Sequence, residues 1–202
     1  MAVLKTTTYW RNNMNAEVKE INNDVLDGID TGKVMSLAGR IQADEDYGKF
    51  RFRAANRWVD GAKSKTSIQS FFAGGRERTD REQPMFVDAD QPTFLAGGNT
   101  APNSVEHLLH ALTSCLTTTL AYHAAVQGIP LGAIETSAEG DLNSKGFFGL
   151  SEDAQKGYER VRVNMRVASN ASVETLTALA MNSPVYDMVS RAAPVEFSMT
   201  TN

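Results

Sequence analysis

The chain has 202 residues, of which 42% are hydrophobic and 22% are charged. This composition is typical of one globular domain with a substantial core. The net charge of −4 argues against nucleic acid or a membrane surface as the main partner. A single cysteine cannot form an internal disulfide, and the first ten residues lack the apolar core of a signal peptide. We therefore expect a cytoplasmic protein.

The first 48 residues are predicted to be a helical extension that precedes a domain over residues 49–202. Apolar residues recur in it at helical spacing, at Val18, Ile21, Val25 and Ile29. Gly28 and Gly32 suggest the end of that helix. The pattern contains no candidate catalytic residue, so we interpret it as a docking or dimer-stabilising helix.

Strand signals begin at Phe50, where apolar residues alternate with Arg51 and Arg53. Asp60-Gly61 is a turn signal, and Thr66–Phe72 can pair back as a hairpin. The next segments are predicted to be a charged loop at Arg76–Arg81, a short strand at Met85–Val87 and a loop at Gly97–Asn99.

A long helix is predicted from Ser104 to Gln127, ending at Gly128. Asn103 suits its N-cap, and Glu106 stands at the capping-box position. One helical face combines Val105, Leu108, Leu112 and Cys115. The thiol is therefore predicted on the apolar side of the helix. It is either inert packing or a nucleophile in a shielded pocket.

Two strands are predicted after the helix, over Ile134–Leu142 and Tyr158–Val167, because apolar and polar residues alternate in both. The loop between them carries Phe147, Phe148 and Leu150, which either fold onto the core or form the lid of an apolar pocket. A helix from Ser172 to Met181, a second helix start at Ser183-Pro184 and a last strand at Val195, Phe197 and Met199 complete the pattern. This order of elements indicates the α+β class.

The run from Pro102 to Cys115 resembles the first cysteine motif of the OsmC/Ohr family, the osmotically inducible and organic hydroperoxide resistance proteins. The resemblance covers residues 49–202 and continues to Ser183-Pro184-Val185-Tyr186, where the family carries its second cysteine motif. It implies an intertwined homodimer with curved antiparallel sheets packed on long central helices. It also implies reduction of organic hydroperoxides by a cysteine pair.

The chain departs from that pattern in three places. Ser183 replaces the second cysteine, so the usual resolving disulfide is impossible. The family's carboxylate position holds Val105, and Glu106 stands nine residues before Cys115, roughly 180° around a straight helix. The hairpin arginine is matched in position by Arg57, with Arg53 as the competitor.

Two functions from different classes follow. In the first, Cys115 attacks the O–O bond of a small apolar hydroperoxide, Arg57 favours the thiolate and orients the peroxide, and an external thiol reduces the sulfenic acid. Glu106 would hold the arginine, although capping explains it fully. In the second, the fold is a non-enzymatic binder of an apolar ligand. The missing second cysteine favours the binder, and the retained Cys115 favours the enzyme.

We expect no cofactor, no metal, no nucleic acid partner and no membrane partner. His107 and His110 share a side of the helix at a spacing that can hold a metal, but no third ligand is near them. The apolar circumference of the same helix is too wide for one sheet to cover, which predicts a homodimer. Its residues include Leu108, Leu109, Leu112, Leu116 and Leu120.

Overall fold

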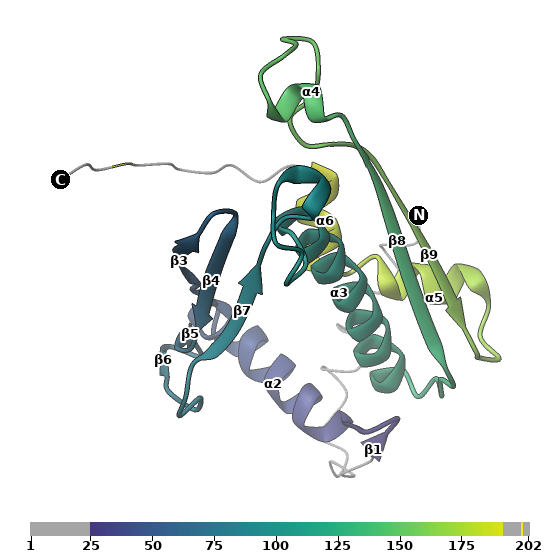
Figure 1. Ribbon diagram of the computed structural model, residues 1–202. Helices are drawn as coiled ribbons and strands as arrows, with labels where there is room; N and C mark the ends of the chain where they lie inside the picture. The colour runs from purple at the N-terminus through teal and green to yellow at the C-terminus, as the bar shows by residue number, and fades with distance from the viewer. Residues whose placement is uncertain (1–24, 192–198, 200–202) are drawn as a thin grey trace. The chain divides into compact units, whose positions relative to one another are not determined.

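The computed structural model describes residues 25–191 and residue 199, and it mixes helices with open sheets (Figure 1). The α+β prediction is therefore confirmed. The chain forms two compact units. Of the described residues, one unit contains Leu26–Ile29 and residues 109–191, and the other contains Asp30–Leu108.

The predicted end of the N-terminal helix is a β-hairpin instead. β1 (Val25–Leu26) and β2 (Ile29–Asp30) pair around Asp27 and Gly28, which both have positive φ. Asp-Gly suits such a turn, and this local signal outweighs the helical spacing of the apolar residues. The helix α2 (Thr31–Ala43) follows, and the Asp30 carboxylate caps it by accepting the Lys33 N–H at 2.9 Å. Val18 and Ile21 lie outside the described residues.

A three-stranded antiparallel sheet lies in the unit of residues 30–108. Its order is β3 (Ala55–Asp60), β4 (Lys63–Ile68) and β7 (Met85–Ala89). The predicted hairpin and the short strand at Met85 are confirmed, but the first strand begins five residues later than expected, and the returning strand is Lys63–Ile68 instead of Thr66–Phe72. Before it, Arg51 makes only an isolated bridge to Phe72.

A second hairpin occupies part of the segment that was predicted to be a charged loop. β5 (Phe71–Ala73) pairs with β6 (Arg76–Arg78) across two glycines with positive φ. Glycine adopts this backbone without strain, so a tight turn forms despite the charged sequence. Phe72 lies opposite Glu77, whose carboxylate binds the Arg53 guanidinium through two hydrogen bonds of 2.7 and 2.8 Å.

The loop between β7 and the long helix is organised around a buried carboxylate. Asp90 is 1% exposed and accepts the backbone N–H groups of Gln91, Gly98 and Thr100, as well as the Thr100 hydroxyl. These hydrogen bonds, above all that from the Thr100 backbone, lower the pKa of Asp90 to about 2. The loop also packs tightly at Gly97, where a Cβ would lie 2.0 Å from the Gln91 carbonyl oxygen.

Protonating Asp90 should remove its contribution to stability. The pKa is lowered in the folded state, so this contribution is present above the ordinary value near 3.8 and is lost as the pH falls through about 2. We therefore expect wild type to melt at a higher temperature than Asp90→Asn at neutral pH. The gap should narrow between pH 4 and pH 2 in thermal melts. A gap that stays constant over this range would contradict this role for the carboxylate.

The core of the other unit is a stripe on the helix α3 (Ser104–Val126), which matches the predicted helix closely. Leu112, Leu116, Leu120 and Ala124 are buried at intervals of four residues. They cluster with Leu176, Leu179 and Ala180 of α5 (Val173–Ala180). This regular spacing makes α3 the central element of the unit.

A long antiparallel ribbon packs against the same core (Figure 1). Its strands, β8 (Ile134–Leu142) and β9 (Tyr158–Val167), have the predicted bounds. Val161, Met165 and Val167 pack toward the core as predicted, but Val163 is exposed.

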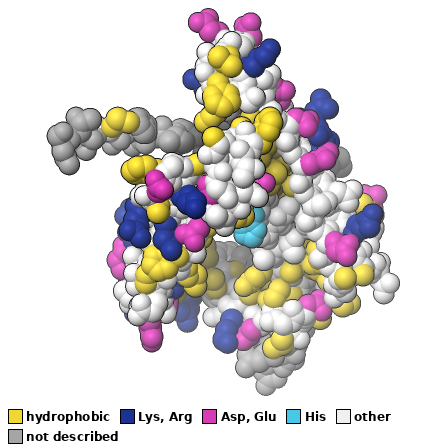
Figure 2. All heavy atoms as spheres, viewed as in Figure 1, with side chains coloured by type: hydrophobic (Ala, Val, Ile, Leu, Met, Phe, Trp, Pro, Cys, Tyr) yellow, Lys and Arg dark blue, Asp and Glu magenta, His cyan; other side chains and the backbone are white. Residues whose placement is uncertain are grey.

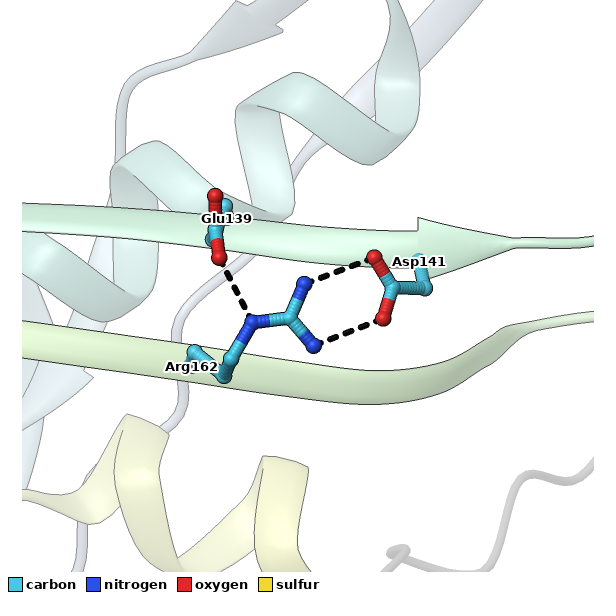
Figure 3. Close-up of polar contacts among 3 residues, drawn as sticks. All are labelled: Glu139, Asp141 and Arg162. Atoms are coloured by element: carbon cyan, nitrogen blue, oxygen red, sulfur yellow. Dashed lines mark hydrogen bonds and ion pairs between the residues drawn. The ribbon is translucent and has the colours of Figure 1, made fainter.

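Ion pairs cross the outer face of the ribbon at Arg162. Its guanidinium donates to Glu139 at 2.6 Å and to both carboxylate oxygens of Asp141 at 2.6 and 2.7 Å (Figure 3). These hydrogen bonds raise the pKa of Arg162, and they lower the pKa of Asp141. The predicted polar face therefore carries paired charges at Arg162.

The loop that joins β8 to β9 contains the short helix α4 (Ser144–Phe147) and carries apolar side chains on its surface. Phe147, Phe148 and Leu150 are exposed, so folding onto the core, one of the two predicted alternatives, is wrong. Figure 2 shows hydrophobic side chains at the surface in this region, next to charged ones. The other alternative, that this loop forms the lid of an apolar pocket, stays a prediction.

The C-terminal elements begin as expected. α5 is capped by Ser172, and α6 (Pro184–Arg191) follows Ser183. Val195 and Phe197 of the predicted last strand lie outside the described residues, and Met199 is exposed and not in a strand.

Candidate functional site

Cys115 lies in the middle of α3, beside the buried stripe rather than in it. Its side chain is half-buried, whereas Leu116, the next residue, is 1% exposed. Among the described residues its polar contact is with Thr119, whose hydroxyl oxygen lies 3.9 Å from Sγ. The thiol is therefore partly exposed at the edge of the core.

The predicted face of α3 differs from the buried one. Val105 and Leu108, which were expected to share an apolar side with Cys115, are exposed, and Leu112 alone of the predicted set is fully buried. The buried stripe repeats every four residues from Leu112 to Ala124. A helix that is apolar around much of its circumference offers two such stripes, and sequence spacing alone does not choose between them.

The start of α3 forms the predicted capping box. The Glu106 N–H donates to Asn103 Oδ1 at 2.9 Å, and the Asn103 N–H donates to Glu106 Oε2 at 2.8 Å. These reciprocal hydrogen bonds satisfy two backbone donors at the helix end. One carboxylate oxygen of Glu106 is thereby engaged in the cap, nine residues before Cys115 on the same helix.

Arg57 and Arg53, the two candidate arginines, have different surroundings. Arg53 is held by Glu77 through two hydrogen bonds. Arg57 is exposed on β3 and lines a pocket of about 300 Å³, to which Lys63 and Lys65 of β4 also contribute. Of the two guanidinium groups, that of Arg57 makes no ion pair with the described residues. The two lysines were missed by the sequence analysis, although their i, i+2 spacing on a strand places them on one face.

Ser183 is fully buried at the start of α6, and its hydroxyl accepts the Tyr186 N–H at 3.2 Å. This is the capping role that the sequence predicts. Val185, two residues later, packs against the cluster that contains Leu112 and Leu116. The start of α6 thus packs against the same core cluster to which α3 contributes.

His107, one of the two histidines of the predicted pair, has a structural role. His107 Nε2 lies 3.0 Å from the Asp88 carbonyl oxygen, to which the ring donates when that nitrogen is protonated. Within residues 25–191 no three His, Cys, Asp or Glu side chains gather as metal ligands. Over the same stretch, no helix combines the length and the apolar character needed to cross a membrane.

The comparisons with known proteins agree on one family. The model of the family described as "OsmC-like protein" matches residues 97–198, half of the chain. No curated protein matches the sequence.

Two solved structures share the fold. An OsmC-like protein from Mycoplasma pneumoniae is 12% identical, with a TM-score of 0.53 over 70% of this chain and 89% of its own. An OsmC-like protein of unknown function from Vibrio cholerae is also 12% identical, with a TM-score of 0.51 over 68% of this chain and 92% of its own. At these identities the likeness shows the fold alone. The family match over half of the chain places the protein in the OsmC-like protein family.

Proposed function

We propose that this protein reduces organic hydroperoxides with Cys115 as its single reactive thiol. The observation that carries the proposal is the position of Cys115 at the edge of the core in the central helix of the OsmC-like region. A cysteine that only fills the core would take a place in the buried stripe, such as that of Leu116. A half-buried thiol beside apolar side chains suits a small apolar substrate.

The reaction needs one thiolate and an external reductant. The Cys115 sulfur attacks the terminal peroxide oxygen, the S–O bond forms as the O–O bond breaks, and the alcohol leaves with a proton. A first small thiol then attacks the sulfenic acid, releasing water and leaving a mixed disulfide. A second thiol attacks that disulfide and restores Cys115. The cytoplasm, where such thiols are abundant, is the location that fits this cycle.

Arg57 is the cation that we assign to this chemistry. The family resemblance implies that its positive charge favours the thiolate and orients the peroxide, and the Arg53 guanidinium is already bound by Glu77. The assignment predicts that Arg57→Gln slows alkylation of Cys115 by iodoacetamide at neutral pH. Arg53→Gln, the matched control, should leave the rate near that of wild type.

A non-enzymatic ligand binder is the second candidate, and Ser183 is the observation that favours it. A serine in place of the resolving cysteine removes the internal disulfide from the cycle. Turnover of alkyl hydroperoxides with small thiols separates the two candidates. Catalytic consumption of peroxide by wild type supports the enzyme, whereas ligand binding without turnover supports the binder.

Ser183→Cys should restore a two-cysteine pair. Because the start of α6 packs against the same core cluster as α3, we expect a disulfide with Cys115 after peroxide treatment, provided that the two Cα atoms lie within ~7 Å. The stability loss should be about 1 kcal/mol or less, since only the cap is weakened. Intact mass analysis should show the loss of two hydrogen atoms. Without this disulfide, the match between Ser183 and the family's second cysteine would be wrong.

We also propose that the protein forms a homodimer. The sheet of residues 55–89 exposes large apolar side chains of β3 and β7 on one face of the single chain: Trp58, Met85 and Val87. Surface of this kind marks an interaction site, and a second copy is the partner that the family resemblance implies. We expect a dimer at micromolar concentration in light scattering, and a stable monomer would contradict this expectation.

A further inference from the structure

The pocket beside Arg57 carries an excess of positive charge. It is lined by the cations Arg57, Lys63 and Lys65 and by one carboxylate, that of Asp88. Val59, Ala89 and Ala101 add apolar wall. All of these residues belong to the unit of residues 30–108.

Strand register brings two of the cations together. Arg57 of β3 lies directly opposite Lys65 of β4, and Lys65 in turn lies opposite Asp88 of β7. Like charges at opposed positions destabilise a sheet. Asp88 forms an ion pair with Lys65 at 3.5 Å, so the row contains two cations and one anion. Arg57 is left beside a like charge, without a carboxylate partner in the described part of the chain.

Lys63 adds a third cation on the same face of β4. The Lys63 ammonium lies close to the backbone of Gly98. A Cβ added to this glycine would be 3.3 Å from Nζ, so a side chain there would crowd the ammonium. The carboxylate of Asp90 lies close to the same point, but it already accepts four hydrogen bonds from its own loop. No ion pair joins Lys63 to any described residue. The pocket therefore holds two cations without a counter-ion in contact.

We propose that this pocket binds a small anion bearing carboxylate or phosphate groups. The Arg57 guanidinium offers paired donors that match either group, and the Lys63 ammonium supplies a second charge. The volume of about 300 Å³ suits a ligand of a few heavy atoms, and the apolar wall favours an organic one. The inference does not depend on peroxide chemistry at Cys115.

Calorimetric titration at low ionic strength tests this site, with inorganic phosphate and succinate as probes and no peroxide present. Phosphate and succinate each carry one of the two proposed groups. The anion that binds more tightly shows whether the pocket prefers phosphate or carboxylate. We expect saturable binding to wild type that weakens about tenfold in Lys63→Gln and in Arg57→Gln. Lys33→Gln is the matched control, because Lys33 lies in the same unit but is paired with Asp30.

The proposal is supported if anion binding is weaker in Lys63→Gln and Arg57→Gln and unchanged in Lys33→Gln. Binding that does not saturate, or that falls equally in all three variants, would overturn it in favour of general charge attraction. Circular dichroism of each variant shows whether it is folded. Since no step of the titration uses Cys115, a failure here is distinguishable from a failure of the peroxidase proposal.

Discussion

Cys115→Ser should abolish thiol-dependent hydroperoxide reduction. Serine preserves the volume and the helix but supplies no thiolate, so we expect turnover to fall at least about 100-fold, to the rate of the uncatalysed reaction. The measurement is peroxide consumption with a small-thiol reductant. Thermal stability should change little, because the Cys115 side chain lies outside the buried stripe.

Ser114→Ala is the matched control for this loss. Ser114 is the neighbouring residue on α3, exposed to solvent, and its hydroxyl donates only to the Ala111 carbonyl at 3.2 Å. Turnover in Ser114→Ala should equal that of wild type. If Cys115→Ser keeps full activity, another group performs the chemistry and Cys115 is not the nucleophile.

Leu116→Ala should cause a large loss of stability. Leu116 is almost fully buried and belongs to the cluster that joins α3 to α5. Truncation removes buried methyl groups and leaves a cavity, which lowers the free energy of unfolding by about 2–5 kcal/mol. Urea denaturation followed by circular dichroism measures the change.

Leu108→Ala makes the same chemical change on the same helix at an exposed position. It should lower the free energy of unfolding by less than about 1 kcal/mol, because little surface is removed from water in the folded chain. Equal losses in the two variants would contradict the assignment of the buried stripe.

Local sequence signals predicted the elements that carry one clear pattern. The bounds of β8 and β9 follow from strict alternation of apolar and polar residues, and the start of α3 follows from Asn103 and Glu106. Where two signals compete, the prediction failed. Near Gly28 a helical spacing overlaps a turn signal, and the hairpin forms. At β6 the charged residues suggested a loop, but two glycines allow a tight turn and the segment forms a strand.

The candidate site was predicted only in part, since its properties depend on packing. The spacing of apolar residues predicted that Cys115 lies on a helix. The exposure of its side chain depends on which face of α3 packs against α5 and the ribbon of β8 and β9. The sequence left Arg53 and Arg57 as alternatives, and only the contact with Glu77 separates them. The opposition of Arg57 and Lys65 needs strand register, which one sequence does not fix.

The most direct test of the central claim is the fate of Cys115 after one equivalent of an alkyl hydroperoxide. Mass spectrometry with a sulfenic-acid trap such as dimedone follows the modification site. We predict a trapped sulfenic acid on Cys115, no intramolecular disulfide, and recovery of the reduced thiol when a small thiol is added before the trap. If Cys115 takes up no oxygen under conditions that oxidise an exposed model thiol, it is not the peroxide-reactive group.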